Sequence, residues 1–135
     1  MLMYYDARPN TVFNGLFDFY TYRPLKGYYP FYYFANLYEL ENQVQSDSDD
    51  SDIRITAAEK DGKCGAMISY FAPEDDAAEK TLSLTLDRGG VFRCYLVDSE
   101  RTNEPTELKI EKNSLVTLQL EPQSVLYLEF DSKIS

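Results

Sequence analysis

Apolar and polar residues alternate with a period of two through most of the second half of the chain. Side chains of a β-strand point alternately to the two faces of a sheet, so this alternation predicts strands with one buried face. Turn residues such as Asp61-Gly62 and Gly89-Gly90 separate the runs, and Asp61-Gly62 suits a tight hairpin. The pattern predicts seven strands, at residues 53–58, 64–71, 80–86, 91–97, 106–110, 115–120 and 124–130.

The apolar phase of these strands predicts a core. Seven short strands at regular spacing, with no helix between them, predict an antiparallel β-sandwich. The residues expected to point inward are Ile53, Ile55, Ala57, Cys64, Ala66, Ile68, Tyr70, Leu82, Leu84, Leu86, Phe92, Cys94, Leu96, Leu108, Ile110, Val116, Leu118, Leu120, Leu126, Leu128 and Phe130.

The first part of the chain follows another pattern. After a turn at Asn14-Gly15, residues 16–20 resemble a short buried strand. A helix is then predicted over residues 28–40, because Pro30 suits a first turn and apolar residues recur at helical spacing. These apolar residues are Pro30, Tyr33, Phe34, Leu37 and Leu40. The predicted fold class is therefore mainly β: an antiparallel β-sandwich of about seven strands preceded by an aromatic-rich segment with one α-helix.

Aromatic residues are concentrated at the beginning of the chain. Residues 1–38 hold fourteen of the twenty Tyr and Phe residues. Large rings dominate cores and interfaces, so a segment this rich in them is expected to pack against something the chain does not contain. We divide the chain into an aromatic-rich remnant of a larger structure at 1–45, an acidic linker at 46–52 and a β-sandwich domain at 53–135. The linker lacks the glycine and the distal glutamate of a calcium-binding EF-hand loop, so a solvated, flexible connector is expected.

Composition limits the function classes. The net charge is −10 and no basic patch interrupts it, which disfavours nucleic-acid binding. The longest apolar runs are too short to span a bilayer, so no membrane partner is expected. The chain has no histidine, which excludes a Ser-His-Asp or Cys-His nucleophile system, and we expect no cofactor or metal. Cys64 and Cys94 are expected to be buried free thiols, although sequence alone leaves a disulfide open.

Asp6, Arg8 and Asp18 are charged residues that interrupt the aromatic segment. Beside Tyr5 and its neighbours they could line a sugar site, where rings stack on pyranose faces and carboxylates accept hydroxyl hydrogen bonds. Asp6 and Arg8 could instead form a local ion pair that holds a loop, and we favour this interpretation for the isolated chain. Paired carboxylates are abundant, but most lie in linkers and turns, so a complete glycosidase active site is not expected in this chain.

Three segments resemble a known group of enzymes. YYDARP, then FNGLFDFYTYRPLKGYYPFYYFANLYEL, and the final EPQSVLYLEF resemble the C-terminal portion of (β/α)8 glycoside hydrolases, in particular family 39 xylosidases and family 51 arabinofuranosidases. The resemblance implies that residues 16–20 correspond to the last barrel strand and residues 28–40 to the last barrel helix. It places the catalytic glutamates upstream of this chain. It also implies that Tyr5, Asp6 and Arg8 lie near the parent's substrate face.

Three functions remain open at this point. The first is a non-catalytic C-terminal β-sandwich domain that supports a catalytic barrel absent from the chain, in which case the chain alone is inactive. The second is a carbohydrate-binding module that uses Tyr95 and Tyr127, on the outward phase of their strands. The third is a protein-interaction domain, whose aromatic segment would pair with the missing barrel or with a second copy to form a homo-oligomer.

Overall fold

The computed structural model describes residues 15–131, which form one α-helix, a short 3-10 helix and eight strands. The elements are η1 (Lys26–Tyr28), α1 (Tyr29–Glu39), β1 (Asn42–Val44), β2 (Ile53–Lys60), β3 (Lys63–Tyr70), β4 (Lys80–Thr85), β5 (Gly90–Val97), β6 (Thr102–Ile110), β7 (Leu115–Leu120) and β8 (Ser124–Asp131). Within this part of the chain, no helix is long and apolar enough to cross a membrane.

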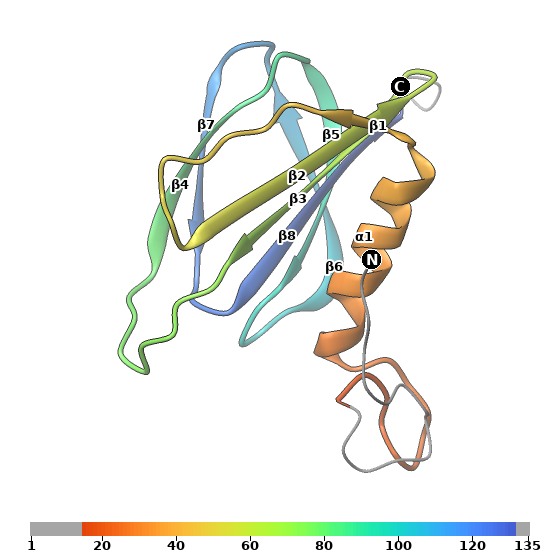
Figure 1. Cartoon of the computed structure of the whole chain (residues 1–135), viewed down its shortest axis with the longest axis vertical. Coiled ribbons are helices and arrows are strands. Elements are labelled where there is room, and N and C mark those ends of the chain that lie inside the picture. The colour runs from red at the N-terminus through yellow and green to blue at the C-terminus, as the bar shows by residue number, and fades with distance from the viewer. Residues whose placement is uncertain (1–14, 132–135) are drawn as a thin grey trace.

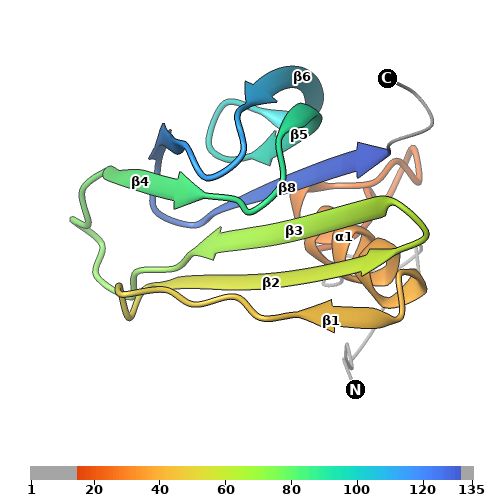
Figure 2. The same cartoon turned by 90° about the horizontal axis from the view of Figure 1, so that it is seen from above.

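The strands form two antiparallel sheets that face each other (Figure 1). One sheet has six strands in the order β1-β2-β3-β8-β5-β6, and the other pairs β4 with β7. Figure 2 shows β4 on one side of the large sheet and helix α1 on the other. The predicted fold class is therefore confirmed: the protein is mainly β, with antiparallel sheets and one helix.

We call the core between the two sheets the aliphatic core, because most of its buried members are aliphatic. The registers bring Ile68 and Leu96 beside Leu126 on the inner face, so three neighbouring strands contribute one continuous row. Full burial of such a side chain is worth about 1.5–3 kcal/mol. The buried members of this core are Ile53, Ile68, Tyr70, Ala72, Leu84, Phe92, Ile110, Leu120, Leu126 and Leu128, nearly all of them residues predicted to point inward.

The seven predicted strands are all present, as β2 to β8. Asp61 and Gly62 join β2 to β3 with φ values of 52° and 84°, which is the geometry of a tight hairpin turn with both central residues left-handed. The sequence pattern missed β1. This strand has three residues and no buried side chain, so it leaves no hydrophobic alternation to read.

Helix α1 packs on the outer face of the six-stranded sheet. Pro30 lies in its first turn, as predicted, and Tyr33 and Leu37 are its two buried side chains. The chain leaves the helix at Glu41, whose φ of 63° turns it back toward β1. Tyr33 and Leu37 pack with Ala58, Val97 and Tyr127 in a second core, separate from the aliphatic one.

The expected strand at residues 16–20 is wrong. Phe17 forms a single β-bridge with Pro24, and the residues between them make a turn. Asp18 causes the turn: its carboxylate accepts hydrogen bonds from the backbone N–H groups of Tyr20 and Thr21 and from the Thr21 hydroxyl, at 3.1, 2.7 and 2.7 Å. Short polar side chains that bond to nearby backbone compete with strand pairing in this way.

The acidic linker is more than a solvated connector. The ammonium group of Lys80 on β4 lies 2.7 Å from Asp50 and 2.8 Å from Asp52, so two linker carboxylates are tied to the small sheet. The hydrogen bonds to Asp50 and Asp52 raise the pKa of Lys80. The division into residues 1–45, 46–52 and 53–135 stays a prediction. Cys64 and Cys94 are free and half-buried, in agreement with the expectation of free thiols.

Candidate functional site

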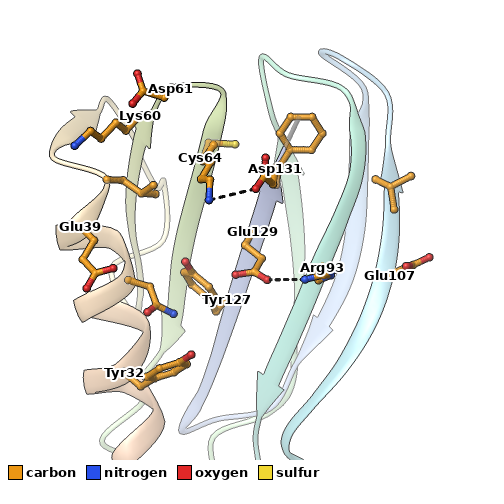
Figure 3. A pocket seen from close by; sticks show the side chains of 15 residues that line it. Tyr32, Glu39, Lys60, Asp61, Cys64, Arg93, Glu107, Tyr127, Glu129 and Asp131 are labelled. Carbon is orange, nitrogen blue, oxygen red and sulfur yellow. Dashed lines mark ion pairs between the residues drawn. The ribbon is translucent and has the colours of Figure 1, made fainter. Parts of the chain in front are cut away.

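An open groove runs between helix α1 and the uncovered part of the six-stranded sheet (Figure 3). Its volume is about 660 Å³, within the range of roughly 300–1,000 Å³ that is common for small-molecule sites. We call it the α1 groove. Its lining comprises Tyr32, Asn36, Glu39 and Leu40 on the helix side, Lys60, Asp61, Lys63 and Cys64 near the β2–β3 hairpin, and Val91, Arg93, Glu107, Tyr127, Glu129, Phe130 and Asp131 on the sheet.

Stacked tyrosines hold the helix against the sheet at the base of this groove. The rings of Tyr33 and Tyr127 are nearly parallel, with centroids 4.8 Å apart, and Tyr95 lies 6.2 Å from Tyr127. Gly65 on β3 makes the approach possible, because a Cβ there would lie 2.9 Å from both the Leu37 methyl group and the Tyr127 hydroxyl. The missing side chain therefore sets how closely α1 can approach.

The two stacked rings differ in what their hydroxyl groups do. The Tyr33 hydroxyl donates a hydrogen bond to Oδ1 of Asn103 at 2.5 Å. No described residue forms a hydrogen bond with the Tyr127 hydroxyl, although the side chain is only 3 % exposed. Burial raises the pKa of both phenols, so each remains a neutral donor at physiological pH.

Glu129 is the central carboxylate of the groove. Its Oε1 atom accepts a hydrogen bond from the Tyr95 hydroxyl at 2.9 Å and lies 3.7 Å from the guanidinium of Arg93. Burial, followed by the hydrogen bond to Glu129, raises the pKa of Tyr95. The two contacts fix the position of Glu129 while the residue continues to line the groove.

The cations of the groove are already paired. Lys60 lies 2.7 Å from Glu41, Lys63 lies 3.3 Å from Asp131, and Arg93 contacts Glu129. The lining has five carboxylates and three basic side chains, which gives a local charge of −2. The electrostatics of the groove therefore favour a neutral or cationic ligand over an anionic one.

The carboxyl groups with clear pKa shifts do not have the character of a catalytic acid. Hydrogen bonds from Thr21 lower the pKa of Asp18, and the ammonium of Lys80 lowers that of Asp50. Burial alone would raise the pKa of Asp98, but its contacts with Arg101 outweigh this and lower it. A general acid needs a raised pKa, so these three groups act as structural anions. Among residues 15–131, no cluster of His, Cys, Asp or Glu could hold a metal ion.

The structure describes only some of the site residues that the sequence suggested. Tyr5, Asp6 and Arg8 lie outside the described residues, so their role near a substrate stays a prediction. Tyr95 and Tyr127 do lie on the outward phase of their strands, but helix α1 covers that face and Tyr127 is buried. They cannot act as exposed sugar-stacking rings. Glu129 and Asn36, which line the groove, were missed by sequence reasoning.

A further set of rings remains exposed on the loop at 17–25 and on the outer side of α1. The most exposed are Tyr20, at 86 %, and Tyr38, at 79 %. Ring contacts connect the loop to the helix, because Phe17 packs on Tyr28 and Tyr28 stacks on Tyr32. We call this region the aromatic surface and define it by Phe19, Tyr20, Tyr22, Leu25 and Tyr38.

Sequence comparisons leave the chain without an assigned family. No protein-family description matches it, and no curated protein matches it significantly. The fold, in contrast, has counterparts among solved structures.

Two xylanases share the fold over most of this chain. One is the glycoside hydrolase family 30 subfamily 8 xylanase Xyn30A from Clostridium acetobutylicum, with a TM-score of 0.65 and 17 % identity over 88 % of the chain. The other is a family 30 endoxylanase from Clostridium papyrosolvens C71, with a TM-score of 0.54 and 15 % identity over 67 % of the chain. The matches span 31 % and 23 % of those two enzymes. The fold therefore matches part of family 30 glycoside hydrolases.

Proposed function

We propose that the chain is a non-catalytic β-sandwich domain of a glycoside hydrolase, which supports a catalytic (β/α)8 barrel that lies outside the chain. The fold likeness to family 30 xylanases supports this proposal, and so does its extent, since it spans less than a third of each enzyme. The likeness of the segments YYDARP and EPQSVLYLEF to families 39 and 51 points to the same broad group of barrel glycosidases and to the C-terminal part of such an enzyme.

The observation that carries the proposal is the two-sided character of helix α1. One side of the helix buries Tyr33 and Leu37 against the sandwich, which fixes the helix as part of the domain. The opposite side and the preceding loop expose the aromatic surface, including Tyr22 at 59 % and Tyr38 at 79 %. Large exposed apolar side chains of this kind are typical of an interface. A barrel packed there would cover these rings and join the two domains through one helix.

In this role the chain contributes stability and not chemistry. The catalytic glutamates would come from the barrel, and Tyr5, Asp6 and Arg8 would lie near the parent's substrate face. The purified chain is expected to release no product from xylan or from aryl xylosides and arabinofuranosides. Reproducible hydrolysis by the chain, abolished by a substitution of one of its own carboxylates, would contradict the proposal.

The interface can be tested with the barrel polypeptide encoded immediately upstream of Met1, produced separately. We expect a one-to-one complex by light scattering and a higher melting temperature of the barrel when the chain is added. The variant Tyr20→Ser/Tyr22→Ser should weaken the complex. Leu115→Ser is the matched control, because Leu115 is 67 % exposed on β7 and lies outside the aromatic surface. Absence of a barrel-encoding stretch, or equal binding by both variants, would overturn the proposal.

A second candidate function uses the same surface. The exposed rings of Tyr20, Tyr22 and Tyr38 could pair with a second copy of the chain, which would make the protein a homo-oligomer. Light scattering of the purified chain tests this. A dimer that dissociates in Tyr20→Ser/Tyr22→Ser supports self-association, and a monomer at micromolar concentration removes it.

A further inference from the structure

The α1 groove has features of a ligand site that the proposed supporting role does not use. Its two walls come from elements far apart in sequence: Tyr32, Asn36 and Glu39 from helix α1, and Tyr127 and Glu129 from strand β8. Figure 3 shows Tyr32 and Glu39 on the helix side and Tyr127 and Glu129 on the sheet opposite them. The two walls are rigidly connected, because the Tyr33–Tyr127 stack lies between helix and sheet.

The Tyr127 hydroxyl is the observation that points to a ligand. In the described part of the chain, every fully buried side-chain nitrogen or oxygen has a hydrogen-bond partner. The Tyr127 hydroxyl has none among these residues, yet the side chain as a whole is only 3 % exposed. The hydroxyl must therefore be the part of the ring that reaches the groove. A phenol hydroxyl usually finds a partner, and here water or a ligand in the groove has to supply it.

The charges of the groove restrict the ligand. All three cationic side chains contact carboxylates, so their charge is already balanced, and the net negative charge of the lining disfavours a phosphate or a carboxylate ligand. The groups that remain are the amide of Asn36, the carboxylates of Glu39 and Glu129, the phenol of Tyr127 and the half-exposed ring of Tyr32. Together these groups can accept hydrogen bonds from ligand hydroxyl groups, donate hydrogen bonds to them, and offer one flat apolar ring face.

We propose that the α1 groove binds a short neutral oligosaccharide. Sugar hydroxyl groups would donate to Glu39 and Glu129 and accept from the amide of Asn36 and the phenol of Tyr127, while the ring of Tyr32 would lie against a pyranose face. The proposal differs from a carbohydrate-binding module with exposed stacking rings, because recognition here comes mainly from hydrogen bonds inside a groove. It does not depend on barrel docking, since the aromatic surface is defined by other residues.

The test is titration of the full chain with neutral xylo-, cello-, manno- and arabino-oligosaccharides, followed by calorimetry and by NMR shifts of the groove residues. We expect saturable binding of at least one of them, with a dissociation constant of about 1 mM or tighter. Tyr127→Phe should weaken binding about 3–10-fold, since it removes one neutral hydrogen bond. Glu129→Gln should weaken it about tenfold or more, since it removes a charged acceptor.

Matched variants separate binding from folding. Tyr127→Phe keeps the ring stack and removes a hydroxyl with no described partner, so its melting temperature should not change. Tyr33→Phe removes the hydroxyl that is bonded to Asn103, so it should lower the melting temperature and leave sugar affinity unchanged.

Three results would overturn the proposal. The first is the absence of saturable binding across the whole panel. The second is binding that Tyr127→Phe and Glu129→Gln leave unchanged, which would place the sugar elsewhere. The third is salt-sensitive binding of oligolysine to the groove without binding of any sugar, which would assign the groove to a cationic peptide.

Discussion

The two faces of the six-stranded sheet use the same strands but different chemistry. The face toward β4 and β7 is mainly aliphatic, and Leu126 and Leu128 on β8 are fully buried there. The face toward α1 is built from tyrosines, with Tyr127 on the same strand stacked on Tyr33 of the helix. The small sheet of β4 and β7 covers the first face, whereas the second face remains partly open as the α1 groove.

This difference indicates that the two faces of the sheet have different roles. The inner layer has few polar atoms to satisfy, and its buried Tyr70 hydroxyl donates to the carbonyl of Ala78 at 2.8 Å, so this layer stabilises mainly by burial and packing. A tyrosine layer buries large rings and also places hydroxyl groups at defined positions. The outer face can therefore hold a helix in place and present polar groups to a ligand. We expect the inner face to dominate stability and the outer face to dominate recognition.

The largest effect is expected from Leu126→Ala. Leu126 is 2 % exposed and lies beside Ile68 and Leu96, so its removal leaves a cavity in the middle of the aliphatic core. We expect the free energy of unfolding, measured by urea denaturation, to fall by about 2–5 kcal/mol. Val125→Ala is the matched control, because the adjacent half-buried residue points to the α1 side. Equal losses in the two variants would contradict the division between the faces.

A smaller loss is expected from Gly65→Ala on the outer face. The new methyl group would lie 2.9 Å from the Leu37 methyl and from the Tyr127 hydroxyl, so the helix has to move away from β3. Overpacking of this kind costs about 1–3 kcal/mol in the free energy of unfolding.

A double-mutant cycle tests the cause of that loss. Leu37→Ala removes one of the two atoms in the clash, so the double variant Gly65→Ala/Leu37→Ala should be more stable than the sum of the single losses predicts. Strict additivity in urea denaturation would show that Gly65 does not set the approach of α1.

The inner face could be predicted from the sequence, because alternation with period two is a local signal. The pattern is plain in Leu82 and Leu84 on β4, in Leu86 just after the end of β4, and in Val116, Leu118 and Leu120 on β7, and all of them pack in the aliphatic core. The strand expected at residues 16–20 failed because its apolar residues suggested burial, while the carboxylate of Asp18 organises a turn.

The outer face was harder to predict. Val125 and Tyr127 alternate with Leu126 and Leu128, and such a nearly continuous apolar run is typical of a strand buried on both faces. This apolar run indicates burial on both faces, whereas the outward phase of Tyr95 and Tyr127 alone suggests exposed rings. The groove itself depends on where α1 docks, and no local pattern records the position of Asn36 opposite Glu129. Tyr5, Asp6 and Arg8 lie beyond the described residues and remain predictions.

The stability of the protein should depend on pH through the thiol of Cys94, which packs against the core on the inner face. Burial raises the pKa of Cys94 from the ordinary value of 9.0 to about 11. The thiol of the unfolded chain therefore ionises first, so the stabilisation is complete below the unfolded pKa and is lost as the pH rises toward the folded one. With allowance for partial solvent exposure, the loss is about 1–2 kcal/mol.

The measurement is urea denaturation from about pH 7.5 to about pH 9, where unfolded tyrosines, with a pKa of about 10, are still largely protonated. Stability of the wild type should fall through this interval. Burial also raises the pKa of Cys64, so Cys94→Ala should remove the larger part of the slope and the double cysteine variant nearly all of it. A slope that both variants retain would rule out the thiols as its origin.

The smallest effect concerns the two stacked tyrosines of the outer face. Tyr33→Phe removes a hydroxyl that donates to Asn103 at 2.5 Å and leaves that amide oxygen without its partner, so the free energy of unfolding should fall by about 0.5–1.5 kcal/mol. Tyr127→Phe removes a hydroxyl that no described residue engages, and its stability should stay within about 0.5 kcal/mol of the wild type. Urea denaturation of the two variants side by side measures the difference. If Tyr127→Phe costs as much as Tyr33→Phe, the Tyr127 hydroxyl serves the fold. The outer face would then be a second structural core, and the groove would lose the polar group that distinguishes it from the inner face.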